Sequence, residues 1–220
     1  PLTALRPEAA PPRLTPAGLK RGIIARAGAD TMIVLPPERR VLDTTAEEFW
    51  GLLKNEARVG HLVEGRGFSF GKDRGGSTAR LIEWSAGTAV QVHVVEPVPA
   101  ALLDLTVVDV NSSLVRWLLS WGRVRDAAIC LGRPYLLEGL VVRGYQRGQA
   151  LGFATANLQC GDQLVPADGV YAGLATVDDV RYAAAVSIGT LPTYGGNRRQ
   201  VEAHLVGFDA DLYDQVLRVE

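Results

Sequence analysis

Residues 139–158, GLVVRGYQRGQALGFATANL, combine glycines, arginines and oxygen-bearing side chains in a pattern that suits phosphate chemistry. Glycines let backbone N–H groups face an anion without a Cβ atom in between, and arginines add positive charge beside them. Thr155 and Asn157 alternate with alanines, so an extended segment would place both side-chain oxygens on one face. Such hard oxygens suit Mg²⁺ bound together with nucleotide phosphates. The candidate phosphate contacts are Gly144, Arg147, Gly148, Gly152, Thr155 and Asn157. A glycine-rich hairpin with a solvated loop is the simpler alternative.

A carboxylate in residues 201–205, VEAHL, offers a base for such a site. Alternation places Glu202 and His204 on one face of a strand and the aliphatic residues on the other. A carboxylate facing a phosphate site is what a general base for a hydroxyl nucleophile requires. The simpler alternative is a solvated outer face of the strand.

Residues 65–71, GRGFSFG, invite three motif assignments, of which two fail outright. The dinucleotide-binding fingerprint fails because its third glycine falls one position late and no helix opens there. A phosphate loop of the Walker A type fails because Asp73 follows the glycine-lysine pair. A G-x-S-x-G nucleophile elbow centred on Ser69, with His93 or His204 as its base, is disfavoured because a polar loop follows instead of a helix.

Two further places suit a nucleotide. Ligands bind at strand ends in open α/β sheets, so we expect a nucleotide contact near Gly65 and Phe68. Ser112, Ser113 and Arg116 lie at the start of an expected helix, where free N–H groups and the helix dipole favour a phosphate. An ordinary capped helix is the simpler alternative at the second place.

The first half of the chain alternates helices and strands in the manner of a parallel α/β layer. A Thr15-Pro16 start predicts the first helix, and Thr45 with Glu48 predicts a capping box for the second. The expected helices cover about residues 15–28, 45–53 and 78–85. The expected strands cover residues 31–35, a buried one, and residues 61–64 and 89–95.

Two more helices close the first half, and from Tyr135 onward the pattern changes to period-two alternation. Asn111 and the following serines cap a helix that runs past Leu119, and a second helix covers residues 124–131. Expected strands cover residues 136–143, 170–177, 182–188, 201–206 and 215–219. This pattern predicts an antiparallel barrel or sandwich. We place the boundary near Gly132, which gives domains 1–132 and 133–220.

Composition limits the classes of function. The chain has 220 residues, 47% hydrophobic, with a net charge of −1, so it presents no global basic field for nucleic acid. It shows neither an apolar run of membrane-spanning length nor a signal peptide, and Cys130 and Cys160 suit a reducing compartment. We therefore expect a soluble cytoplasmic protein. The start at Pro1 and the stop at Glu220 inside a strand-like run suggest missing sequence at both ends.

Taken together, the motifs resemble the bacterial bifunctional riboflavin kinase and FMN adenylyltransferase family, also called FAD synthetase. The first half matches through residues 63–65 and 68–71 and through Ser112, Ser113 and Arg116. The second half matches, in family order and spacing, through LGRPY (131–135), Gly144 with Arg147 and Gly148, GFATAN (152–157), PADGVY (166–171), SIGT (187–190) with Pro192 and Thr193, VEAHL (201–205) and DLY (211–213).

The resemblance implies a fold and two successive reactions. The fold is a nucleotidyltransferase-like, Rossmann-like parallel sheet, incomplete at its N-terminus, followed by an antiparallel β-barrel of riboflavin-kinase type. In the barrel, Glu202 would take the proton from the 5′-hydroxyl of riboflavin, while Thr155 and Asn157 hold Mg²⁺ and the ATP phosphates. In the first half, FMN would attack a second ATP to give FAD.

The chain also departs from the family pattern. Ala154 stands where the family has proline, Tyr145-Gln146 where it often has Asp-Lys, and Asp214 where it usually has glycine. The histidine-glycine-histidine nucleotide unit and the C-terminal helix have no counterpart. These departures keep a second interpretation open, a non-catalytic flavin or nucleotide sensor with the same fold. The sequence leaves the oligomeric state open, a homo-oligomer included.

Overall fold

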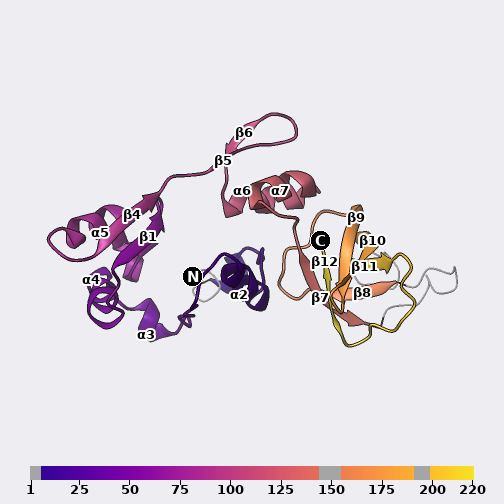
Figure 1. Cartoon of the computed structure of the whole chain (residues 1–220), viewed down its shortest axis with the longest axis horizontal. Helices are drawn as coiled ribbons and strands as arrows, with labels where there is room; N and C mark the ends of the chain where they lie inside the picture. Colours follow the sequence, from indigo (N-terminus) through magenta and orange to yellow (C-terminus); the bar gives the residue numbers. More distant parts are fainter. Residues whose placement is uncertain (1–5, 144–154, 191–198) are drawn as a thin grey trace. The chain divides into compact units, whose positions relative to one another are not determined.

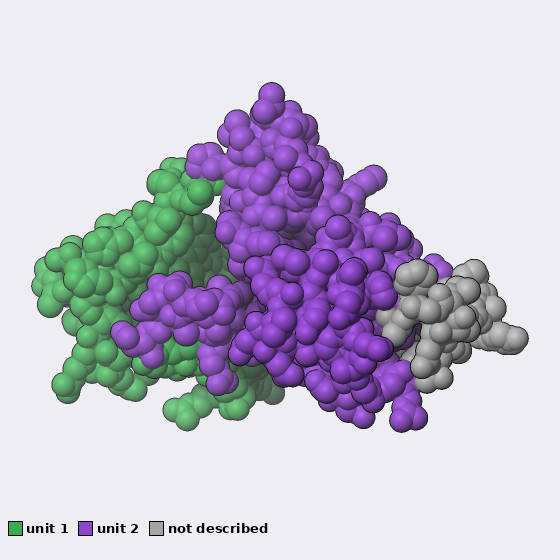
Figure 2. Space-filling model, turned by 45° about the vertical axis from the view of Figure 1, so that its right-hand side comes forward, with its two compact units in different colours: residues 1–10, 31–98 green, residues 11–30, 99–220 purple. Residues whose placement is uncertain are grey.

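The computed structural model describes residues 6–143, 155–190 and 199–220 (Figure 1). The chain divides into two compact units, coloured separately in Figure 2. Unit 1 comprises Pro1–Ala10 and Thr31–Val98, and unit 2 comprises Pro11–Asp30 and Pro99–Glu220. Among the described residues, no helix is long and apolar enough to cross a membrane.

Unit 1 contains a short parallel sheet, as the alternation of helices and strands predicted. Strands β1 (His61–Gly65) and β4 (Gln91–Val95) pair in parallel, and α5 (Thr78–Ser85) connects them. The smaller elements are η1 (Pro7–Ala9), α3 (Arg39–Leu42), α4 (Ala46–Gly51), η2 (Leu52–Glu56), β2 (Ser69–Phe70), η3 (Lys72–Arg74) and β3 (Gly76–Ser77). The predicted capping box is confirmed, because the Thr45 hydroxyl accepts from the Glu48 N–H and the Glu48 carboxylate accepts from the Thr45 N–H.

The core of unit 1 is small. Ala46, Phe70 and Leu81 are buried in one cluster, and the side chains of Leu62 and Val92 from the sheet pack against it. The other face of the sheet lies open, since β1 and β4 both alternate exposed and half-buried residues.

Two local predictions in the first half were wrong. Residues 31–35 form no strand, and Ile33, Val34 and Leu35 are 79%, 69% and 58% exposed. An apolar, β-branched run becomes a strand only where a neighbouring strand pairs with it, and no described strand does so here. The predicted first helix forms as α2 (Ala17–Arg26), in unit 2, but its predicted N-cap Thr15 is wrong, because Pro16 is the N-cap and no side chain caps the helix.

The longer segment of unit 2, Pro99–Glu220, begins with a hairpin and two helices. Strands β5 (Pro99–Ala101) and β6 (Val107–Asp109) precede α6 (Ser112–Ser120) and α7 (Val124–Leu131), which have the predicted extents within a residue or two. Gly122, with φ of 70°, turns the chain between the helices, and a Cβ there would meet the Tyr171 hydroxyl at 3.0 Å. Glycine therefore permits a sharp turn directly against the barrel.

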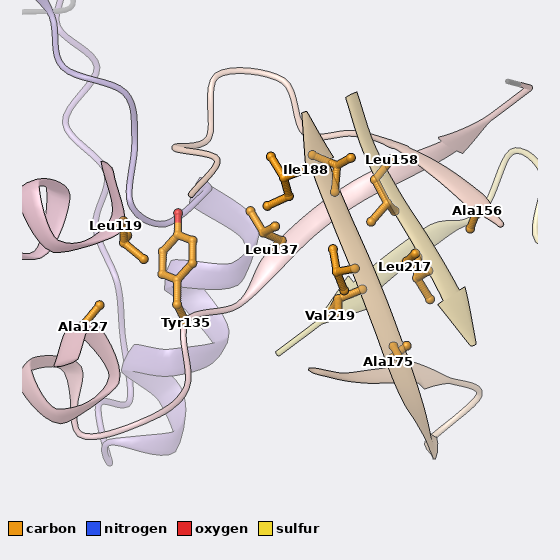
Figure 3. Close-up of a cluster of buried hydrophobic side chains, with 14 of the residues drawn as sticks. Leu119, Ala127, Tyr135, Leu137, Ala156, Leu158, Ala175, Ile188, Leu217 and Val219 are labelled. Carbon is orange, nitrogen blue, oxygen red and sulfur yellow. The ribbon is translucent and has the colours of Figure 1, made fainter. Parts of the chain in front are cut away.

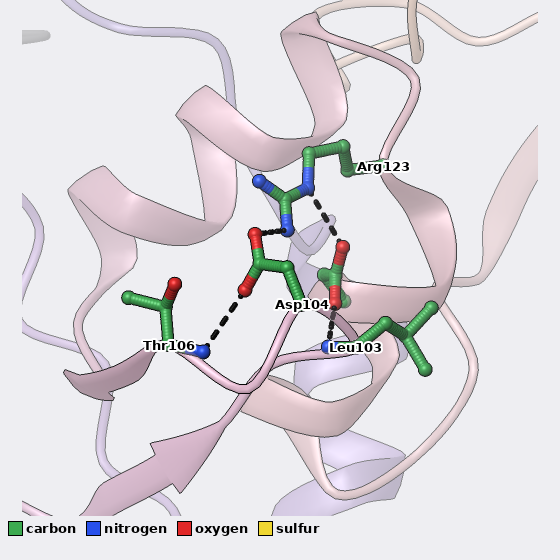
Figure 4. Close-up of polar contacts among 5 residues, drawn as sticks. Leu103, Asp104, Thr106 and Arg123 are labelled. Carbon is green, nitrogen blue, oxygen red and sulfur yellow. Dashed lines mark hydrogen bonds and ion pairs between the residues drawn. The ribbon is translucent and has the colours of Figure 1, made fainter.

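The hairpin is held to α7 by the ion network of Figure 4. Arg123 donates to the Asp126 carboxylate at 2.7 Å and to the Asp104 carboxylate at 2.8 Å. Asp126, only 4% exposed, also accepts from the Leu103 backbone N–H at 2.8 Å. The pKa of Asp104 is lowered, first by the hydrogen bond from the Thr106 backbone and then by Arg123.

The second half closes into an antiparallel barrel, which settles the choice between barrel and sandwich. Its strands follow the order β10-β11-β8-β7-β12-β9, and β9 pairs with β10 to close it. Their bounds are β7 (Leu137–Val142), β8 (Ala156–Gln159), β9 (Gly169–Val177), β10 (Val180–Thr190), β11 (Arg199–Leu205) and β12 (Val216–Val219).

One hydrophobic core joins the barrel interior to the two helices (Figure 3). Leu137, Leu158, Ile188 and Leu217 point into the barrel, and Leu119 of α6, Ala127 of α7 and Tyr135 belong to the same core. This shared core explains why residues 99–131 group with the barrel by contact. The division into domains 1–132 and 133–220 stays a prediction.

Candidate active site

The centre of the candidate site is a cross-strand pair on the barrel. Strands β8 and β11 are antiparallel neighbours, with Glu202 opposite Asn157 and Ala203 opposite Ala156. Residues directly opposite each other have Cβ atoms about 5 Å apart. The pairing therefore brings the predicted base beside one of the predicted magnesium ligands, although 45 positions of sequence separate them.

Alternation along both strands decides which side chains reach the outer face. Val201, Ala203 and Leu205 are at most 4% exposed inside the barrel, and Ala156 and Leu158 are buried beside them. Asn157, Glu202 and His204 are half-buried on the opposite side of their strands. The side chains of the candidate site therefore lie outside the barrel, on strands whose inner faces are fixed by the core.

Two further residues adjoin the pair. Ser187 of β10 lies opposite Glu202 on its other side. Thr155 is half-buried and directly precedes β8, where the register of β8 and β11, continued by one pair, places it opposite His204. The outer face thus gathers hydroxyl, amide, carboxylate and imidazole groups from three neighbouring strands.

Several predicted phosphate contacts lie outside the described residues, namely Gly144, Arg147, Gly148 and Gly152. The nearest described arginine, Arg143, places its guanidinium over the Tyr213 ring, 5.6 Å from the ring centroid. Tyr213 is held in turn by its N–H, which donates to the Asp211 carboxylate at 2.8 Å. The DLY motif therefore contacts the residue that immediately precedes the glycine-rich stretch.

The candidate site at α6 differs in detail from its prediction. Asn111 is the N-cap, and its side chain accepts from the Leu114 N–H at 2.9 Å. Ser112 and Ser113 are the first two helical residues and are exposed. Arg116 donates to the carbonyl oxygens of Pro12 at 3.0 Å and Ser112 at 3.2 Å, so its guanidinium is anchored beside the helix start.

In unit 1, Gly65 ends β1 and Phe68 follows it. A Cβ at Gly65 would meet no atom within 4 Å, so the strand end is open. Phe68 is half-buried and stacks on Phe70, with ring centroids 5.5 Å apart. Phe68 therefore contributes to the small core as well as to the strand end.

The nucleophile-elbow geometry does not form. Ser69 lies in β2, which a short 3-10 turn follows, and its hydroxyl accepts from Arg74 at 3.3 Å. His93 lies against His61, with 3.0 Å between His61 Nδ1 and His93 Nε2. Neither contact provides the serine–histidine pair that this chemistry requires.

A separate cavity of about 450 Å³ in unit 2 is mostly apolar and contains none of the predicted site residues. Tyr135, Val186, Ile188 and Val219 are among the residues that line it. Burial raises the pKa of Tyr135 to about 12, and its hydroxyl donates to the Leu164 carbonyl at 2.7 Å. This hydroxyl is therefore a structural donor.

Sequence reasoning did not single out Gln200, although its position two residues before Glu202 on the same strand face was readable from the alternation. The sequence could not show that the side-chain oxygen of Gln200 is buried, because the burial of a single atom depends on tertiary contacts.

Two family models match the chain: one described as FAD synthetase over residues 1–105 and one described as riboflavin kinase over residues 131–220. The bifunctional riboflavin kinase/FMN adenylyltransferase of Escherichia coli (strain K12) is 32% identical over 221 residues, covering 100% of this chain and 69% of the relative. The relative of the same name from Bacillus subtilis (strain 168) is 29% identical and covers 94% of this chain and 65% of its own length.

A solved structure has the same fold. The crystal structure described as a macrolide-efflux protein from Streptococcus pneumoniae superposes with a TM-score of 0.79 at 26% sequence identity. The match covers 94% of this chain and 65% of the solved chain. The chain therefore spans about two thirds of the length of the relatives that it matches.

Proposed function

This chain belongs to the bifunctional riboflavin kinase/FMN adenylyltransferase family, and we propose from that membership that it takes part in two ATP-dependent steps of flavin nucleotide synthesis. The barrel phosphorylates riboflavin to FMN. The α/β half transfers the adenylyl group of a second ATP to FMN, giving FAD and pyrophosphate.

The pairing of Glu202 with Asn157 is the observation that carries the kinase assignment. Glu202 takes the proton of the ribityl 5′-hydroxyl as the oxygen bonds to the γ-phosphorus of ATP, and the bond from that phosphorus to the leaving ADP oxygen breaks. A positioned general base contributes about 10²–10⁴-fold to such a step. The rigid barrel wall beneath the pair supports the positioning on which phosphoryl transfer depends.

The outer face also suits a magnesium ion. Asn157 and Thr155 supply neutral oxygens on the strand next to the carboxylate of Glu202, and oxygen ligands are those that Mg²⁺ prefers. When bound there, Mg²⁺ supplies charge neutralisation for the ATP phosphates. Gly144, Arg147, Gly148 and Gly152 remain our proposed phosphate contacts by their motif alone.

For adenylyl transfer we propose two sets of nucleotide contacts, each considered within its own unit: Gly65 and Phe68 at the end of β1 in unit 1, and Ser112, Ser113 and Arg116 at the start of α6 in unit 2. The open strand end and the anchored guanidinium of Arg116 support these assignments. We place the protein in the cytoplasm, where riboflavin and ATP are available and where its two unpaired cysteines stay reduced.

The test is a product assay with the purified chain. Riboflavin, ATP and Mg²⁺ are incubated with the protein, and riboflavin, FMN and FAD are separated by chromatography and detected by flavin fluorescence. We expect FMN to accumulate at a rate proportional to protein concentration, and excess EDTA to stop it. Riboflavin binding without FMN or ADP production at saturating Mg²⁺ and ATP would contradict the kinase assignment.

A further inference from the structure

Gln200 carries a buried acceptor that has no donor among the residues that the structure describes. Its side-chain oxygen, Oε1, is shielded from solvent and has no hydrogen-bond partner in the described part of the chain. Leaving a buried polar atom unpaired is unfavourable, and such atoms in folded proteins call for an explanation. A ligand that supplies the donor is one such explanation.

The position of Gln200 ties this acceptor to the proposed kinase site. Gln200 and Glu202 are two residues apart on β11, so their side chains leave the strand on the same outer face. Their Cα atoms are about 6.6 Å apart at the usual strand rise. A five-carbon sugar alcohol chain whose end lay at Glu202 would extend over this distance.

The neighbouring strand leaves room beside Gln200. The residue opposite it on β10 is Gly189, and a Cβ there would meet no atom within 4 Å. Residue 189 therefore places no side chain beside the Gln200 amide on the β10 side.

The chemistry of the amide oxygen selects the kind of group that it can receive. An amide oxygen only accepts hydrogen bonds, so it pairs with hydroxyl or N–H groups and not with a fully ionised phosphate. Both riboflavin and ATP carry hydroxyl groups. Since the ribityl 5′-hydroxyl is the group placed at Glu202, the remaining ribityl hydroxyls lie nearest to Gln200.

We propose that Gln200 is a substrate-positioning residue whose Oε1 accepts a hydrogen bond from a ribityl hydroxyl of riboflavin. This inference rests on the proposed kinase function, because the placement of the ribityl chain does. The contact orients the chain so that its terminal hydroxyl meets Glu202, and it makes the site selective for flavins that carry a polyol.

The test compares wild-type protein with Gln200→Leu, a variant of similar volume without the acceptor. Affinities for riboflavin and for lumiflavin, which has the same ring system with a methyl group in place of the ribityl chain, are measured by quenching of flavin fluorescence. We expect the variant to bind riboflavin about three- to tenfold more weakly, the loss of one hydrogen bond, and to bind lumiflavin as the wild type does. In turnover, KM for riboflavin rises and KM for ATP stays unchanged. Gln91→Leu, an exposed strand glutamine in unit 1, is the matched control.

Thermal unfolding of the ligand-free variants separates this role from a structural one. Because Leu removes an unpaired buried acceptor, Gln200→Leu keeps or raises the Tm. A Tm that falls by several degrees would show that Oε1 already has a donor within the protein, and would overturn the proposal. Riboflavin affinity within twofold of wild type, an equal loss for lumiflavin, or a rise in KM for ATP alone would also overturn it. The proposed function fails separately, if wild-type protein binds riboflavin but forms no FMN.

Discussion

The strands of the barrel in unit 2 and of the parallel sheet in unit 1 differ in how their faces are buried. The barrel closes on itself, and its inner residues share one core with α6 and α7. The parallel pair β1–β4 covers one face with α4 and α5, while Val63 and Val95 on the other face remain 61% and 49% exposed. Parallel sheets usually bury both faces, so the barrel is the better supported of the two.

This difference bears on how well each region can hold a site. Asn157 and Glu202 stand on strands whose alternate residues are locked in the barrel core. Gly65 ends a strand that pairs with one neighbour in the described structure. We therefore expect the outer barrel face that carries Asn157 and Glu202, called the kinase face below, to be rigid by itself. The conformation of the strand end of unit 1 should depend more on the residues that pack against it.

Matched leucine truncations should sharpen the comparison most. Leu217 in the barrel and Leu81 in unit 1 are 2% and 0% exposed. We expect Leu217→Ala to lower the free energy of unfolding by about 3–4 kcal/mol and Leu81→Ala by about 2 kcal/mol, because a small cluster collapses around a cavity more easily than a closed barrel does. Denaturant titration, with hydrogen exchange measured separately for the residues of each unit, gives the free energy of unfolding of each unit. An equal or larger loss for Leu81→Ala would remove the claimed difference.

Alkaline pH should weaken the barrel region selectively. Burial raises the pKa of Tyr135 from 10.0 to about 12 and that of Cys160 from 9.0 to about 11. The native state therefore keeps protons that the unfolded chain releases, and stability falls as the pH rises from about 9 to 12. Burial also raises the pKa of Glu64 in unit 1, but a carboxylate is fully ionised well below pH 9 and adds nothing in this window.

Tyr135→Phe isolates one part of this effect. The variant loses the hydrogen bond to Leu164, which costs about 1 kcal/mol at neutral pH. Between pH 10 and 12, the free energy of unfolding of the variant should fall by about 2 kcal/mol less than that of the wild type. Urea denaturation at several pH values measures both slopes, and parallel slopes for the two proteins would contradict the assignment.

Much of the secondary structure could be predicted from local sequence patterns. The capping box at Thr45, α5 over residues 78–85 and α7 over residues 124–131 follow from caps and periodicity, which act within a few residues. The apolar run 31–35 failed as a strand because strand formation depends on a partner that local sequence does not specify.

The candidate site divides in the same way. Alternation correctly placed Glu202 on the strand face opposite the aliphatic residues, since that pattern is local, and the barrel then makes this face the outer one. The direct pairing of Glu202 with Asn157 comes from the register of two strands far apart in sequence. The anchoring of Arg116 by Pro12 comes from a tertiary contact. The buried oxygen of Gln200 likewise became visible only with the packing around it.

The most direct test of the kinase face is the rate of FMN formation by Glu202→Gln, which keeps the size of the side chain and removes the base. Glu138→Gln is the matched control. Glu138 is a carboxylate on barrel strand β7 that forms an ion pair with Arg218, with 2.8 Å between the paired atoms, and it takes no part in the proposed chemistry. We predict that Glu202→Gln lowers kcat by about 100-fold or more with riboflavin affinity and Tm near wild type, while Glu138→Gln stays within about twofold in kcat. FMN formation by Glu202→Gln at the wild-type rate would contradict the account.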